Sequence, residues 1–156
     1  SSLPLRPKEL QDNAIPSGNA LAVEALLKLD AFVGSSDYRK RAEEALGLVS
    51  DFVTMYPTAF AQWLSGADFA LHNVTQVAVV GNAGRDETKA LLAEIRSSYR
   101  PNMVVAASPV PIPEDAPALL ENRKLKNDIP TAYICKGFSC KLPVNTPKQL
   151  SEQLRA

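Results

Sequence analysis

Asp12-Asn13-Ala14-Ile15-Pro16-Ser17-Gly18-Asn19-Ala20 is a polar stretch, broken by proline and glycine, that runs directly into an apolar segment. Pro16 favours an extended residue before it, and the Ser17 hydroxyl can accept a hydrogen bond from the first free amides of a helix. Gly18 allows another backbone or a ligand to come close. The stretch therefore predicts a loop followed by a helix that begins near residue 19.

The loop carries more polar side chains than one helix cap requires: Asp12, Asn13, Ser17 and Asn19. Two interpretations are open. The side chains form a cap and a network of turn hydrogen bonds, or they face a substrate. Asp12 is then the candidate catalytic residue, as one of two carboxylates in glycoside chemistry, although the sequence does not identify its partner.

Three helices are expected in the first half, over residues 19–33, 37–55 and 57–71. The first and third are almost free of charged residues, whereas the second has one apolar stripe and one charged face. Gly34 is a typical stop for the first helix, and Pro57 suits the first position of the third. Inner helices shielded by an outer helix are typical of an α/α array, so the first and third should need neighbours on more than one side.

The second half has the pattern of a small α/β module. Apolar runs at residues 76–80, 103–107 and 131–135 predict three strands, and a helix capped by Asp86 is expected between the first two. We expect the three strands to be parallel, because a strand, a helix and a strand at this spacing form a βαβ unit. Thr146-Pro147-Lys148-Gln149 has the pattern of a capping box and predicts a terminal helix. The expected domains are residues 1–73 and 74–156, an α+β or α/β organisation.

Charge and hydropathy exclude several classes of function. Lys plus Arg and Asp plus Glu number 17 each, so no excess of basic charge favours nucleic acid or an anionic membrane surface. No transmembrane helix is expected, because the charge-poor stretch 52–67 is short and contains Pro57. The chain begins at Ser1 without a signal-like apolar region, so we expect a cleavage product or a piece of a longer chain.

Cys135 and Cys140 are the two cysteines, and four residues separate them. Two cysteines are too few for a disulfide scaffold, so a reducing, cytoplasmic compartment is the default. Lys136 and Lys141 favour thiolates by proximity, and a redox role and a purely structural role are both open. A zinc site needs four ligands, and the remaining candidate, His72, lies on another element, so no metal is expected. No cofactor is expected either.

The turn Gly81-Asn82-Ala83-Gly84 lies between a predicted strand and a predicted helix, where exposed amides can bind phosphate. It matches neither the dinucleotide-binding glycine pattern nor the P-loop, which favours an ordinary turn. His72 lies where the third helix should end, and a positive charge there would complement the helix dipole. With one histidine in the chain, the sequence specifies no nucleophilic triad.

Residues 12–20 resemble a motif of the thioredoxin-domain-containing, spermatogenesis-associated family and its bacterial YyaL-type relatives. The resemblance continues through further short motifs along nearly the whole chain: Leu27-Lys28-Leu29, Tyr38 with Ala42-Glu43, Tyr56-Pro57, residues 77–81, Tyr99-Arg100-Pro101, and Tyr133-Ile134-Cys135 with Cys140 and Pro143. Members of this family place a thioredoxin-like domain before a six-hairpin α/α toroid similar to glycosidases and sugar epimerases. The resemblance implies that this chain matches their C-terminal region.

Two hypotheses follow. In the first, the chain is the C-terminal segment of such a protein, its helices close the toroid, and the polar loop lies at a rim that faces a small carbohydrate. Its partner is then the missing N-terminal part, or a second copy of the chain. In the second, the chain is a redox-responsive or partner-docking module that uses Cys135 and Cys140. Neither hypothesis assigns a reaction.

Overall fold

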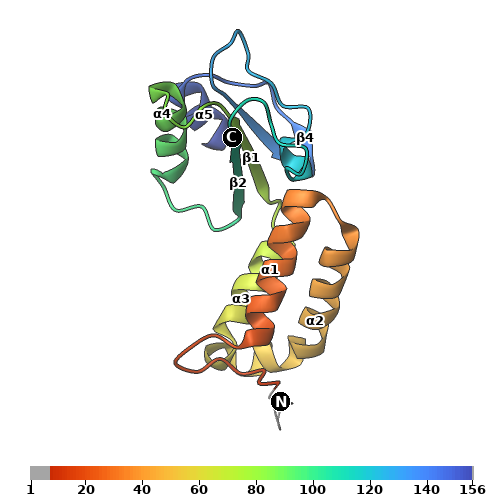
Figure 1. Ribbon diagram of the computed structural model, residues 1–156. Coiled ribbons are helices and arrows are strands. Elements are labelled where there is room, and N and C mark those ends of the chain that lie inside the picture. The colour runs from red at the N-terminus through yellow and green to blue at the C-terminus, as the bar shows by residue number, and fades with distance from the viewer. Residues whose placement is uncertain (1–7, 156) are drawn as a thin grey trace, which may run out of the picture. The chain divides into compact units, whose positions relative to one another are not determined.

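Figure 1 shows a computed structural model of the chain, in which residues 8–155 are described. The described residues divide into two compact units. Residues 8–30 and 35–72 make up the helical unit, and residues 31–34 and 73–155 make up the α/β unit. All strands lie in the second of these.

The first two helices lie where the sequence predicts them. Helix α1 spans Gly18–Val33 and helix α2 spans Ser36–Met55. Gly34 follows α1 with a φ of 69°, a left-handed conformation that glycine adopts without steric cost. The apolar periodicity and the glycine stop are local signals, and both are confirmed.

The third helix is shorter than expected and does not begin at Pro57. A 3-10 turn, η1 (Pro57–Ala59), comes first, and helix α3 (Ala61–Leu71) starts only after Phe60. Phe60 leaves the helical conformation, with a φ of −136°. Its ring is buried and stacks on the ring of Phe52, with 6.2 Å between the centroids. The break in the helix therefore accompanies burial of this aromatic side chain.

The helical unit buries one stripe of each helix and leaves other apolar side chains exposed. Val23, Leu27, Val49 and Trp63 are among its buried residues. Exposed apolar side chains are found on all three helices: Leu21 and Leu29 on α1, Leu48, Phe52 and Met55 on α2, and Leu64 and Leu71 on α3. Considerable apolar surface of the helical unit is thus uncovered.

The α/β unit contains a mixed four-stranded sheet in the order β2-β1-β3-β4. The strands are β1 (Thr75–Val80), β2 (Met103–Ser108), β3 (Thr131–Lys136) and β4 (Ser139–Cys140). Strands β1 and β2 are parallel, as expected for the βαβ unit, but β3 is antiparallel to β1. The prediction of an all-parallel sheet is therefore wrong at β3. Hydrophobic patterning does not encode strand direction, and the segment between β2 and β3 is a loop instead of a crossover helix.

Different elements cover the two faces of the sheet. Helices α4 (Asp86–Arg96) and α5 (Pro147–Arg155) pack on one face, whose core includes Val77, Val79 and Ile134. Because side chains alternate along a strand, Gln76, Ala78 and Val80 point to the opposite face. The turn η2 (Ala118–Leu120) contacts β1 and β2, and Leu119 and Leu120 are buried. The connection 109–130 between β2 and β3 thus contributes core residues.

Of the two caps predicted in the α/β unit, one is confirmed. The Thr146 hydroxyl accepts a hydrogen bond from the Gln149 amide at 3.3 Å, at the start of α5. Asp86 is not a cap but the first helical residue of α4, with Arg85 at the cap position and no capping hydrogen bond from its side chain. A carboxylate in the first turn still complements the helix dipole.

Gly81 and Gly84, in the turn after β1, allow a matched test of packing. A Cβ at Gly81 would lie 2.6 Å from Thr88 Oγ1 and 2.8 Å from Pro130 Cβ, whereas a Cβ at Gly84 would meet nothing within 4 Å. We expect Gly81→Ala to destabilise the α/β unit by about 1–3 kcal/mol through overpacking. Gly84→Ala should change stability by less than about 0.5 kcal/mol. Urea denaturation followed by circular dichroism measures both, and equal effects would contradict the packing role of Gly81.

Candidate functional site

The Asp12 carboxylate joins the polar loop to the starts of two helices. One oxygen, Oδ1, accepts a hydrogen bond from the Ser17 amide at 2.8 Å, immediately before α1. The other, Oδ2, accepts one from the Gln62 amide at 2.8 Å, in the first turn of α3. These amides have no partner within their own helices, and a carboxylate near a helix N-terminus is electrostatically favourable. Asp12 therefore acts as an N-terminal cap for a helix 50 residues away.

The other polar residues predicted in the loop also bond to the chain itself. The buried Ser17 hydroxyl accepts a hydrogen bond from the Ala20 amide at 3.1 Å, which confirms its capping geometry. Asn19 donates to the Glu9 carbonyl at 2.8 Å. Asn13 is exposed, and its side-chain oxygen accepts from the Ala14 amide. Asp12, Asn13 and Ser17 lie in the loop before α1, with Asn13 exposed, and Asn19 lies in the first turn of α1.

Gln62 connects Asp12 with a second carboxylate that sequence reasoning did not single out. Its backbone amide bonds to Asp12, and its side-chain amide donates to Glu24 Oε2 at 2.5 Å. Lys28 forms an ion pair with the other oxygen of Glu24. Trp63 anchors the same loop, because its indole nitrogen donates to the Leu10 carbonyl at 2.7 Å. These contacts hold the loop on the first turn of α3.

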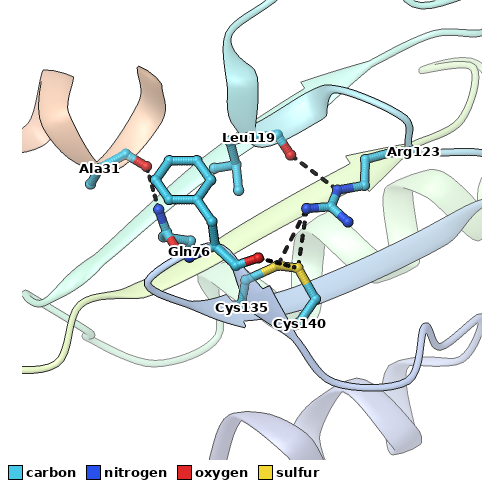
Figure 2. Close-up of a disulfide and its surroundings, with 7 residues drawn as sticks. Ala31, Gln76, Leu119, Arg123, Cys135 and Cys140 are labelled. Carbon is cyan, nitrogen blue, oxygen red and sulfur yellow. Dashed lines mark hydrogen bonds between the residues drawn. A yellow bond between two sulfur atoms is a disulfide. The ribbon is translucent and has the colours of Figure 1, made fainter. Parts of the chain in front are cut away.

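Cys135 and Cys140 form a disulfide between two paired strands, shown in Figure 2. The Cys135 side of the bridge is buried, with 1% of the residue exposed, whereas Cys140 is only partly buried. An open depression of about 230 Å³ is lined by both cysteines and by Lys136, Ser139 and Lys141. The two cysteines are paired with each other, which the sequence left open.

Arg123 contacts both sulfurs, although it lies outside every motif of the sequence analysis (Figure 2). Its guanidinium Nη2 lies 3.1 Å from Cys140 Sγ and 3.8 Å from Cys135 Sγ. Its Nε donates to the Leu119 carbonyl at 3.2 Å, and its Cζ lies 5.0 Å from the centroid of the Tyr133 ring. Within the described residues, Arg123 forms no ion pair with a carboxylate.

The hairpin that holds Cys140 is fixed by a buried glutamine. Gly137 and Phe138 form its two-residue loop and both have positive φ, as type I′ turns require. The Phe138 amide donates to Gln76 Oε1 at 2.8 Å, and Gln76 Nε2 donates to the Ala31 carbonyl at 2.6 Å. Gln76 is 2% exposed. Gln76 is the single polar residue of the predicted apolar run 76–80, and this was the signal that could have identified it.

A cavity of about 540 Å³ lies beside the 109–130 connection. Its lining carries charges of both signs, from Arg123 and Lys124 on one hand and Glu114, Glu121 and Asp128 on the other. A lining of mixed charge does not favour one class of charged ligand over another.

The remaining candidates from the sequence have local partners. His72 Nδ1 lies 2.8 Å from the Asp68 carbonyl and 3.1 Å from the Asp68 carboxylate, at the end of α3. The space above Gly81 is filled by Thr88 and Pro130. Among residues 8–155, no three His, Cys, Asp or Glu side chains gather as a metal site, and none of the helices has the length and apolar character needed to cross a membrane.

No protein-family model matches the chain. The chain is similar to spermatogenesis-associated protein 20 of Homo sapiens, with 30% identity over 158 residues, which cover 99% of this chain and 20% of the human protein. The mouse protein of the same name is also 30% identical over 158 residues. An uncharacterized protein of Caenorhabditis elegans is 30% identical over 156 residues, again 20% of its length. The chain thus spans about a fifth of the length of these relatives, and the similarity fits the family expected from residues 12–20.

Proposed function

We propose that this chain is the C-terminal segment of a longer polypeptide similar to spermatogenesis-associated protein 20, and that its helical unit completes a larger array of paired helices, the α/α toroid that the resemblance implies. The alignment carries this proposal: nearly all of this chain matches only a fifth of each relative. A segment of a larger fold is expected to leave interface surface uncovered when it is considered alone.

The exposed apolar side chains of the helical unit support the proposal. Leu21 and Leu29 are eight residues apart on α1, which places them on one face, and they are 46% and 44% exposed. Leu48 on α2 is 82% exposed. The proposed occupant of these faces is a further helix of the same long polypeptide, because four fifths of the length of each relative lies outside the matched region.

The native polypeptide tests this proposal directly. We expect an antibody raised against the chain to detect, in the source cells, a polypeptide about five times longer than 156 residues, in keeping with the 20% coverage of the relatives. Mass spectrometry of the captured polypeptide should find residues 1–156 near its C-terminus. A native polypeptide of 16.9 kDa would contradict the proposal.

The isolated chain should associate through its uncovered helical faces. We expect Leu21→Gln/Leu29→Gln to weaken self-association roughly tenfold, because the substitution removes about 1.5 kcal/mol of apolar contact. Analytical ultracentrifugation over a concentration series gives the association constant. Leu142→Gln is the control, since Leu142 is 83% exposed but belongs to the α/β unit. A monomeric wild-type chain that binds no hydrophobic dye would contradict this expectation.

A carbohydrate-facing role for Asp12, Asn13, Ser17 and Asn19 stays a prediction of the resemblance. The exposed Asn13 side chain is the member of the loop best placed to meet a ligand. Asp12 uses both carboxylate oxygens for backbone amides, which supports a capping role in this segment. A ligand that binds at Asp12 would have to share or displace these hydrogen bonds.

A second function, thiol–disulfide exchange, is favoured by the Cys135–Cys140 bridge and by the positively charged Arg123 beside it. A nearby guanidinium favours thiolate over thiol, and the thiolate is the reactive form of cysteine. We propose that this pair cycles between the dithiol and the disulfide.

Thiol titration tests the redox proposal. The oxidised chain should contain no titratable thiol after denaturation, and the chain treated with dithiothreitol should contain two. Removal of the reductant and addition of oxidised glutathione should restore an intramolecular bridge without forming a covalent dimer. Two thiols that persist in the presence of oxidised glutathione would contradict the proposal.

A further inference from the structure

We infer that Cys140 is the sulfur that exchanges with external thiols and disulfides, and that Arg123 stabilises its thiolate. This inference rests on the proposed thiol–disulfide exchange and adds which sulfur reacts and what activates it. The external reactant is a small peptide thiol or disulfide, with glutathione as the probe.

The two cysteines differ in their exposure to solvent. Cys135 lies in the middle of the sheet, between β1 and β4, and is 1% exposed. Cys140 lies on the short edge strand β4 and is partly exposed. Exchange requires an incoming sulfur to reach its target, and access is one of the factors that decide which sulfur is attacked. An external reactant can therefore reach Cys140 but not Cys135.

The positive charge of Arg123 also favours reaction at Cys140 over Cys135. The guanidinium of Arg123 is 3.1 Å from Cys140 Sγ but 3.8 Å from Cys135 Sγ. Arg123 is held in place by the Leu119 carbonyl and by the face of the Tyr133 ring, and no carboxylate within residues 8–155 forms an ion pair with it. Its charge is therefore available to a thiolate at Cys140.

The surroundings suit an anionic thiol. The depression that both cysteines line is also lined by Lys136 and Lys141 and by no acidic residue. The Lys141 ammonium donates to the Gln153 carbonyl at 3.0 Å, so its charge is held beside α5. Glutathione carries a net negative charge at neutral pH, so the lysines favour its approach through their long-range field at low ionic strength.

Oxidation then proceeds in two balanced steps. The Cys140 thiolate attacks one sulfur of oxidised glutathione, whose S–S bond breaks, and one glutathione leaves as a thiolate that takes a proton from water. Cys135 loses its proton and attacks Cys140 Sγ. The mixed S–S bond breaks, and the second glutathione leaves and is protonated. Two electrons pass from the two cysteines to glutathione disulfide, and reduction follows the same steps in reverse.

Single-cysteine variants of the 156-residue chain test which sulfur reacts. With oxidised glutathione, Cys135→Ser should form the mixed disulfide at Cys140 at least about ten times faster than Cys140→Ser forms it at Cys135, because access and thiolate content both favour Cys140. Intact-mass spectrometry follows the reaction. Equal rates, or faster reaction at Cys135, would overturn the inference. If wild-type chain reoxidises normally in that case, the redox function itself still stands.

The pH dependence of alkylation tests Arg123. In the Cys135→Ser background, Arg123→Gln should raise the pH midpoint of iodoacetamide alkylation by about one unit, since loss of an adjacent positive charge disfavours the thiolate. Arg123→Lys keeps the positive charge, so its midpoint should lie close to that of the variant with Arg123 intact. The control is Lys124→Gln, which removes a neighbouring exposed charge and should leave the midpoint unchanged. A midpoint that does not move in Arg123→Gln would overturn the role of Arg123, and circular dichroism of the same samples shows that they are folded.

Discussion

Replacing Gln76 with leucine is expected to destabilise the α/β unit by about 2–5 kcal/mol, because one buried and one partly buried backbone group lose their partners. Gln76 accepts from the Phe138 amide and donates to the Ala31 carbonyl, and it is 2% exposed. Leucine has a similar volume but can make neither hydrogen bond. Urea denaturation followed by circular dichroism measures the loss. Hydrogen exchange at the Phe138 amide should also become faster.

The control for Gln76→Leu is the same substitution at an exposed glutamine, Gln149. Gln149 is exposed on α5, and the hydrogen bond at this position comes from its backbone amide. Gln149→Leu should therefore change stability by less than about 0.5 kcal/mol. If Gln76→Leu were equally mild, the two hydrogen bonds would contribute little, and burial of the apolar leucine would outweigh their loss.

Replacing Asp12 with alanine is expected to destabilise the helical unit by about 2–4 kcal/mol, because the Ser17 and Gln62 amides both lose a charged acceptor. Loss of an ordinary helix cap costs about 1 kcal/mol, so an effect above that value identifies the double role. Trp63 is the single tryptophan of the chain and lies in α3. Its fluorescence during urea denaturation therefore reports on the helical unit specifically.

Two further variants separate a structural role of the loop from a ligand-binding role. Asn13 is exposed and bonds only its neighbouring amide, so Asn13→Ala should leave the Trp63 transition unchanged within about 0.5 kcal/mol. Asp12→Asn keeps one acceptor oxygen and should lose about half as much stability as Asp12→Ala. An Asp12→Ala variant that is fully stable but no longer binds a sugar would show that Asp12 serves a ligand.

Local signals predicted much of the fold. The bounds of α1 and α2, the β1–α4–β2 unit and the Thr146 cap all follow from periodicity, stop residues and capping chemistry within a few neighbouring residues. These signals act between residues that are close in the chain, so the sequence displays them directly. The polar loop was located in the same way.

The features that were mispredicted or missed depend on residues far apart in the chain. The third strand was expected to be parallel but is antiparallel to β1. The apolar pattern of a strand is the same in both directions, so it could not show this. The third helix was expected to begin at Pro57, but Phe60 is buried beside Phe52 and the helix starts after it. Arg123 had no sequence signal at all, because its contacts with Cys140 and Tyr133 arise only when the 109–130 connection folds over the sheet.

The sequence alone determined where most helices and strands lie, that a polar loop precedes a helix beginning near residue 19, and that two cysteines near one another were available for chemistry. Tertiary structure decided what these groups do: it placed Asp12 at the start of a helix 50 residues away, paired the cysteines across β3 and β4, and brought Arg123 to their sulfurs. The physical reason is the distance along the chain between the residues that interact. Secondary structure follows from hydrogen bonds and packing within a few turns of chain, whereas a site is assembled from contacts whose partners only the complete fold brings together.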